Sequence, residues 1–168
     1  MEFIYLVFAF VQSLGVSIGI GASTIAVCNY IVAVRDGNVD ESERRLMKVV
    51  YTLLRMAMIA ILVTMVAQAI ILYIATGTYT LYPFVATAWT IVLILFLNAV
   101  LMTFRLMPRF LGPALQAGSW YSLGILYFLS TAGLVNFSFS VFFGGYLVVV
   151  VLALVLINGL LAHFKTSV

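Results

Sequence analysis

Charge is the scarcest property of this sequence. Only 8% of its 168 residues are charged, while 65% are hydrophobic. A soluble globular domain contains about 25% charged and about 45–50% apolar residues. Because so few charged side chains could not cover a water-exposed surface, the composition excludes a soluble enzyme, a nucleic-acid-binding domain and a disordered segment. The remaining class is an integral membrane protein whose surroundings are the lipid bilayer.

Cysteine and histidine are nearly absent as well. The single Cys28 excludes an intrachain disulfide and an all-cysteine metal site. The single His163 cannot provide bis-histidine haem ligation or a histidine metal cluster. No aspartate or glutamate falls in the part of any expected helix that lies in the membrane, which excludes two-carboxylate chemistry there. We therefore expect no cofactor, no metal and no enzymatic activity.

Three long uncharged runs indicate how many helices the chain forms. They cover residues 3–34, 56–104 and 110–164, and a membrane-spanning helix needs about 20 apolar residues. The first run is one span and each of the others is two, divided near residues 76–80, before Pro83, and near 135–138. The sequence predicts one domain, residues 1–168, that is an all-α bundle of five transmembrane helices. Their expected bounds are approximately 3–34, 41–75, 83–107, 114–134 and 140–163.

Lysine and arginine predict the topology of this bundle. In the five-helix arrangement the second and fourth connections carry no charge, and all eight basic residues fall on one side of the membrane. These residues are Arg35, Arg44, Arg45, Lys48, Arg55, Arg105, Arg109 and Lys165. Basic residues concentrate on the cytoplasmic side of membrane proteins. The N-terminus is therefore predicted outside and the C-terminus in the cytoplasm.

A hydrophilic insert separates the first two expected helices. It resembles the second half of a calcium-binding EF-hand loop, but the first two ligand positions would be Val32 and Val34, which offer no side-chain oxygen. A structural interpretation fits better. Gly37 ends the first helix in a left-handed conformation, and Asp40 with Glu43 forms a capping box for the second.

The first helix contains two stripes of small and polar residues at helical spacing. One stripe is Ser13, Ser17, Gly21, Thr24 and Cys28, and the other is Gln12, Gly15, Gly19, Ala22, Ser23 and Ala26. Small residues mark close helix contacts in membranes. We therefore expect a central helix that packs on two sides, with Gly15, Gly19 and Gly21 as packing positions. The alternative is that the hydroxyls of Ser13, Ser17 and Thr24 line a path for water, an ion or a small solute.

Amide and guanidinium groups within the spans are costly unless they have partners. Their expected depths form two layers, an outer pair of Gln12 and Gln68, and an inner group of Asn29, Arg55, Asn98 and Asn158. Hydrogen bonding between helices is one interpretation. A gate, or an anion-binding vestibule built on Arg55, is the other. Arg55 could extend its side chain back to the headgroup region, or it could point into the bundle and hydrogen-bond to one of the three asparagines. The polar stripe that it shares with Glu41, Arg45 and Lys48 favours the inward orientation.

The stretch from Gln12 to Thr24, followed by Asp36-Gly37 and a charged helix start, resembles the opening of uncharacterised small bacterial membrane proteins. The resemblance covers the first third of the chain. It implies a multi-pass protein, with the bacterial inner membrane as its location, and it brings no assigned activity.

These features lead to three hypotheses of function. The first is permeation or transport of a small ion or solute, in a homo-oligomer. The second is a non-enzymatic accessory or scaffold subunit that binds another membrane protein through the small residues of the first helix. The third, an intramembrane enzyme, is disfavoured because the sequence lacks a nucleophile–base pair and a metal site. No nucleic-acid partner is expected.

Overall fold

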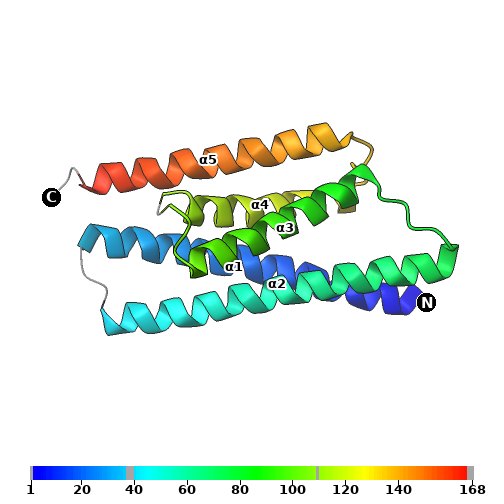
Figure 1. The fold of residues 1–168 in the computed structure, drawn as a ribbon, viewed down its shortest axis with the longest axis horizontal. Coiled ribbons are helices and arrows are strands. Elements are labelled where there is room, and N and C mark those ends of the chain that lie inside the picture. The colour runs from blue at the N-terminus through cyan, green and yellow to red at the C-terminus, as the bar shows by residue number, and fades with distance from the viewer. Residues whose placement is uncertain (1, 37–39, 109, 166–168) are drawn as a thin grey trace.

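The computed structural model describes residues 2–36, 40–108 and 110–165, and it confirms the expected all-helical architecture (Figure 1). The five helices are α1 (Glu2–Asp36), α2 (Glu41–Thr76), α3 (Pro83–Thr103), α4 (Gly112–Thr131) and α5 (Phe139–Lys165). Within these described residues there is no strand. Four of the helices, α1, α2, α3 and α5, are long and apolar enough to cross a membrane, which is compatible with a membrane protein.

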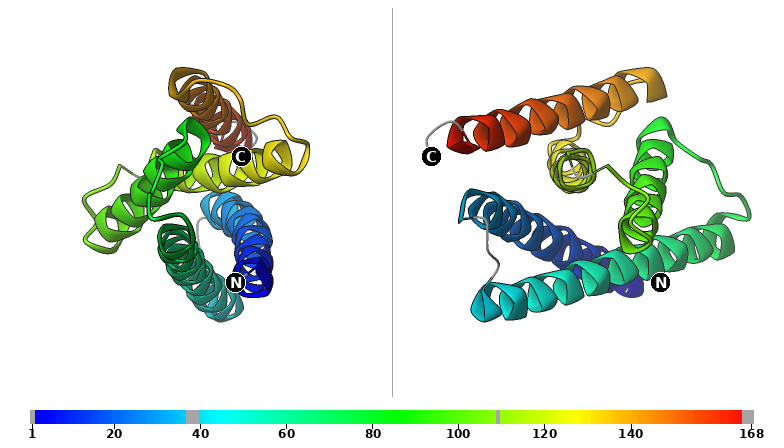
Figure 2. Two further views of the ribbon diagram at one scale, coloured as in Figure 1. Left: turned by 90° about the vertical axis from the view of Figure 1, so that its right-hand side faces the viewer. Right: turned by 60° about the vertical axis from the view of Figure 1, so that its left-hand side comes forward.

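Helix α4 differs from the other four in composition and in position. Polar and small residues such as Gln116, Gly118 and Ser119 lower its hydropathy, and these three are buried. The right-hand view of Figure 2 shows α4 nearly end on, while α1, α2 and α5 are seen lengthways. It packs against α1, α3 and α5. Helix α4 is therefore the most enclosed of the five. Helix α1, expected to be central, contacts α2, α4 and α5, with most of its own surface exposed.

Two helices begin where the sequence predicts. Asp40 is the N-cap of α2: its carboxylate accepts a hydrogen bond from the Glu43 amide at 2.6 Å, and the Glu43 carboxylate accepts one from the Asp40 amide at 3.1 Å. This capping box, which stabilises a helix start by satisfying unpaired amides, is confirmed. Pro83 lies in the first turn of α3, as expected for a residue without an amide hydrogen.

The ends of α3 and α4 fall earlier than predicted. Helix α3 stops at Thr103 rather than 107 because Arg105 adopts a left-handed conformation with φ of 58°. Helix α4 begins at Gly112 and stops at Thr131 rather than 134, just before Gly133 with φ of 73°. Left-handed residues break the helical hydrogen-bond pattern. The expected turn at Gly37, and Arg109, lie outside the described residues.

Successive helices run in opposite directions, so the connections gather at two ends of the bundle (Figure 1). The connections α1–α2 and α3–α4 and the C-terminal end of α5 lie at one end, here named the basic end because Arg44, Arg45 and Arg105 lie there. The N-terminal end of α1 and the connections α2–α3 and α4–α5 lie at the opposite end.

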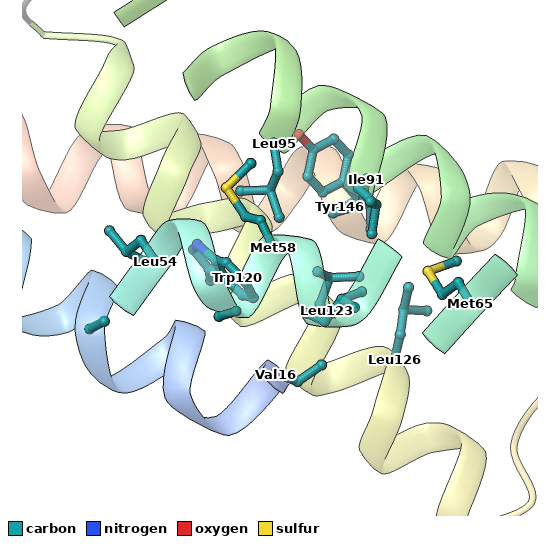
Figure 3. Close-up of a cluster of buried hydrophobic side chains, with 14 of the residues drawn as sticks. Val16, Leu54, Met58, Met65, Ile91, Leu95, Trp120, Leu123, Leu126 and Tyr146 are labelled. Carbon is teal, nitrogen blue, oxygen red and sulfur yellow. The ribbon is translucent and has the colours of Figure 1, made fainter. Parts of the chain in front are cut away.

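Trp120 fills the middle of the core. Figure 3 shows it between Leu54, toward the basic end, and Leu126, toward the opposite end. The indole is fully buried. It packs directly on Gly19, where an added Cβ would lie 2.1 Å from the ring. The glycine thus allows α4 to approach α1 closely.

Candidate functional site

Two cavities of similar size lie between the first four helices. The basic-end cavity has a volume of about 300 Å³, and its polar lining residues are Ser23, Tyr30, Tyr51, Arg55, Thr103 and Gln116. The opposite-end cavity has a volume of about 330 Å³, and its polar lining includes Gln12, Gln68, Thr80, Tyr127 and Ser130. In each of these four helices, the half nearer the basic end lines the basic-end cavity, and the other half lines the opposite-end cavity. The two cavities are therefore arranged along the length of the bundle.

A constriction, made of Gly19, Leu95 and Trp120, lies between the two sets of lining residues. All three are buried, and none of them lines either cavity. Along α1 the lining passes from Val16 in one cavity to Ser23 in the other, a rise of about 10 Å at 1.5 Å per residue. One to two helical turns of packed side chains thus separate the cavities.

The two glutamines predicted as an outer layer line the same cavity. Gln12 reaches it from α1 and Gln68 from α2, and both side chains are partly buried. No hydrogen bond joins them among the described residues. The Tyr127 hydroxyl, on α4, donates to the Ala9 carbonyl of α1 at 2.7 Å and so holds one wall of this cavity together.

The basic-end cavity combines one positive charge with polar groups that lack partners. Arg55 is the only charged residue lining it in the described part of the chain, and its guanidinium has no hydrogen bond or ion pair there. The hydroxyl of Ser23 is buried and unpartnered among the described residues. Gln116 uses its carbonyl oxygen to accept from Asn98 at 3.1 Å, which leaves its amide nitrogen able to donate. A lining with donors and no acidic residue suits an anion.

Two of the three asparagines of the predicted inner layer, Asn98 and Asn158, bind groups other than Arg55, and no hydrogen bond joins Arg55 to any of the three among the described residues, so the predicted hydrogen bond to the guanidinium is wrong. The Asn98 amide donates to the Gly112 carbonyl at 3.1 Å, in addition to its bond to Gln116. The Asn158 amide donates to the carbonyls of Phe110 and Leu154. Both asparagines therefore hold the start of α4 in place, because a buried side-chain amide needs an acceptor within reach.

Asn29, the third asparagine of that layer, has a buried amide nitrogen with no partner among the described residues. It lines neither cavity. The inner group predicted from sequence therefore does not form one cluster: Arg55 lines the basic-end cavity, and the three asparagines do not.

The hydroxyl stripe of α1 lies outside both cavities, so within one chain it does not line the path that was the alternative interpretation. Ser17, Gly21 and Thr24 are exposed, and an added Cβ at Gly21 would have no atom within 4 Å. Ser13 and Ser17 donate to carbonyls of their own helix, and Thr24 also bonds the Tyr121 hydroxyl at 2.7 Å. Because these hydroxyls are satisfied locally, the stripe can face an apolar environment. Within the described residues, Gly21 packs on no other helix.

Gly15 and Gly19 belong to the other stripe, and they do contact neighbouring helices. An added Cβ at Gly15 would lie 3.1 Å from Ile61 of α2, and the corresponding atom at Gly19 would overlap Trp120 of α4. Helix α1 therefore packs tightly through one of its two small-residue faces.

Sequence reasoning missed two polar groups of α4. Gln116 is the only amide side chain of that helix, and this isolation was a signal that it needs a buried partner. Ser119 shares a hydrogen bond of 3.1 Å with the Tyr146 hydroxyl of α5, a contact between two helices that no spacing in the sequence indicates. Both residues lie on the helix that the sequence makes least apolar.

Neither a protein-family model, nor a curated protein, nor a solved structure matches the chain. In the part of the chain that the structure describes, no group of three or more His, Cys, Asp or Glu residues could hold a metal ion. The candidate site is therefore defined by the two cavities and by the groups that line them.

Proposed function

We propose that this chain is a non-enzymatic, multi-pass membrane protein that allows a small ion or solute to cross the bilayer. The observation that carries the proposal is the pair of cavities, lined by the same four helices and separated by Trp120 packed on Gly19. Such an arrangement has the form of a path that is closed in the middle. Selective membrane paths are built from polar groups lining a cavity and from apolar constrictions that gate it.

Flux through reconstituted protein tests this proposal. Proteoliposomes and protein-free liposomes of the same lipid would be loaded in parallel, and the movement of monovalent cations, halides, small carboxylates and glycerol would be measured. We expect at least one of these species to cross faster when protein is present. Equal rates for the whole panel would contradict transport by this chain.

We further propose five membrane spans, with the N-terminus outside and the C-terminus in the cytoplasm of a bacterial cell. Helix α4 has 20 residues, or about 30 Å, which matches the thickness of a bilayer core. Its polar residues are accommodated because α1, α3 and α5 pack around it. The basic residues that define the basic end favour the cytoplasm on that side.

Labelling of introduced cysteines tests the topology. Cys28 would first be replaced by serine, and single cysteines would then be placed at Thr78, in the α2–α3 connection, and at Ser42, at the start of α2. We expect a membrane-impermeant maleimide to label position 78 from outside intact cells, and position 42 only after the membrane is permeabilised. The reverse pattern would contradict the proposed orientation.

A second function, that of an accessory or scaffold subunit, is favoured by one specific feature. The exposed stripe of α1 is smooth, because Gly21 has open space around it and the neighbouring Ser17 and Cys28 are small. A face of this kind allows close approach of another transmembrane helix, either from a second copy or from another membrane protein. Purification in mild detergent distinguishes the two functions: a hetero-complex supports the scaffold, whereas a single homogeneous species without a co-purifying protein supports transport.

A further inference from the structure

The basic-end cavity adjoins a groove between α2 and α3. This α2–α3 groove has a volume of about 240 Å³, and its own apolar lining is Ile59, Phe96, Val100 and Phe104. Four residues line both spaces: Arg55, Met58, Ala99 and Thr103. Figure 2, right, shows α3 crossing α2 steeply rather than running alongside it. The cavity therefore borders, through these four residues, a groove on the side of the bundle where lipid would lie.

Arg55 stands at the junction of the cavity and the groove. Its side chain is exposed, and it has no ion pair or hydrogen bond among the described residues. By contrast, Arg45 on the same helix is paired with Glu41 at 2.6 Å. A guanidinium placed among apolar side chains at the edge of a membrane is costly unless an anion or water neutralises it.

On the cavity side of Arg55, two further donors have no partner within the described chain. The Ser23 hydroxyl is buried, with 1% of the residue exposed, and the amide nitrogen of Gln116 is left over after its carbonyl accepts from Asn98. A carboxylate or phosphate accepts several such hydrogen bonds at once. On the groove side, the lining is apolar and would pack against a hydrocarbon chain.

We propose that this site binds an anionic amphiphile, with its carboxylate or phosphate head between Arg55, Ser23 and Gln116 and its acyl tail in the α2–α3 groove. The inference goes beyond the proposed transport function, because it names a ligand held at the basic-end cavity rather than the species that crosses. The tail-bearing ligand reaches the site from the bilayer, not from water. A free fatty acid and an anionic phospholipid share the required chemistry.

Binding of oleate to the purified full chain, measured by native mass spectrometry from detergent, tests the site. Arg55→Gln should weaken oleate binding by about tenfold or more, because a charge-assisted hydrogen bond contributes about 1.5–3 kcal/mol and 1.4 kcal/mol is a factor of ten. Arg45→Gln is the matched control and should bind oleate as the wild type does. Equal binding by the wild type and both variants would overturn the proposal.

A second variant avoids any concern about folding. Ser23→Ala removes a hydroxyl that is buried without a partner, so folding should not suffer, yet oleate binding should fall several-fold because one donor to the head is lost. An unchanged affinity in this variant would remove Ser23 from the site and contradict the proposed position of the head.

Matched probes separate the parts of the ligand. Oleyl alcohol has the tail without the charge, and acetate has the charge without the tail. We expect both to bind at least about tenfold more weakly than oleate, since each loses one half of the interactions. Equal binding of oleyl alcohol would overturn the role of Arg55, and equal binding of acetate would reduce the site to one for small anions, overturning the role of the groove.

The source of the anion is resolved by competition in nanodiscs. Displacement of oleate by phosphatidylglycerol identifies a phospholipid as the ligand. Oleate that stays bound in the presence of phosphatidylglycerol identifies a free fatty acid, and both outcomes support the shared chemistry.

Failure of this site is distinguishable from failure of transport. If the protein transports a solute but Arg55→Gln does not change oleate binding, the site alone is contradicted. If oleate binding depends on Arg55 but no species crosses the membrane, transport alone is contradicted.

Discussion

At the scale of single residues, two glycines on α1 provide the sharpest contrast. A methyl group at Gly19 would overlap the buried ring of Trp120, whereas one at Gly21 would meet open space. We expect Gly19→Ala to destabilise the protein by about 1–3 kcal/mol through overpacking. Gly21→Ala should be neutral or stabilise by up to about 1 kcal/mol, because alanine favours a helix more than glycine does.

The midpoints of thermal unfolding in one detergent measure this difference. Gly19→Ala should unfold at a lower temperature than the wild type, and Gly21→Ala should not. If both substitutions lowered the midpoint equally, the exposed stripe of α1 would be a packed face after all, either within the chain or between copies of it.

The residue scale also shows what sequence could predict. Polarity and expected depth group Gln12 with Gln68, and the two side chains line the same cavity. It could not say which stripe of α1 faces inward, since both consist of small residues. In a membrane protein lipid is as apolar as the core, so hydrophobicity does not distinguish a buried face from an exposed one. Large apolar side chains such as Phe10, Leu14 and Ile18 are accordingly exposed.

At the scale of helices and connections, Asn98 fixes how α4 follows α3. Its amide pairs with the Gly112 carbonyl and with Gln116, so Asn98→Ala would leave the Gln116 side-chain oxygen without a donor and would also remove the bond to Gly112. We expect a loss of about 2 kcal/mol or more, given about 1–3 kcal/mol for each unsatisfied buried group. Asn158→Ala removes a longer bond of 3.4 Å to Phe110 from a less buried side chain, and it should cost less than about 1.5 kcal/mol.

The fraction of monodisperse protein after stepwise heating compares the two asparagine variants. The prediction is a clear order, with Asn98→Ala lost at lower temperature than Asn158→Ala. Equal loss, or the opposite order, would mean that the start of α4 is held by other contacts.

Helix bounds were largely predictable, and helix orientation was not. The starts of α2 and α3 follow from a capping box at Asp40 and from Pro83, which are local signals. The end of α3 was missed because it depends on a left-handed arginine, Arg105, and such a conformation is unusual outside glycine and asparagine. The oblique course of α4 depends on where Trp120 meets Gly19, a contact between residues about one hundred positions apart that no periodicity encodes.

At the scale of the whole molecule, the helices enclose two cavities and keep them apart. The constriction between them depends on one large side chain, Trp120, which is fully buried and has an indole nitrogen without a partner among the described residues. Its removal would leave space between the cavities, because core structures relax only partly around a large-to-small substitution. The central claim, that the cavities form one interrupted path, therefore makes a direct prediction.

Flux through proteoliposomes containing Trp120→Ala tests that claim most directly. Phe128→Ala, which removes an exposed ring from the same helix, is the matched control, and Trp120→Phe keeps most of the constriction in case the alanine variant is unstable. We predict that Trp120→Ala passes small solutes at least several-fold faster than the wild type, that Trp120→Phe lies between them, and that Phe128→Ala is unchanged. A folded Trp120→Ala protein with wild-type flux would contradict the account.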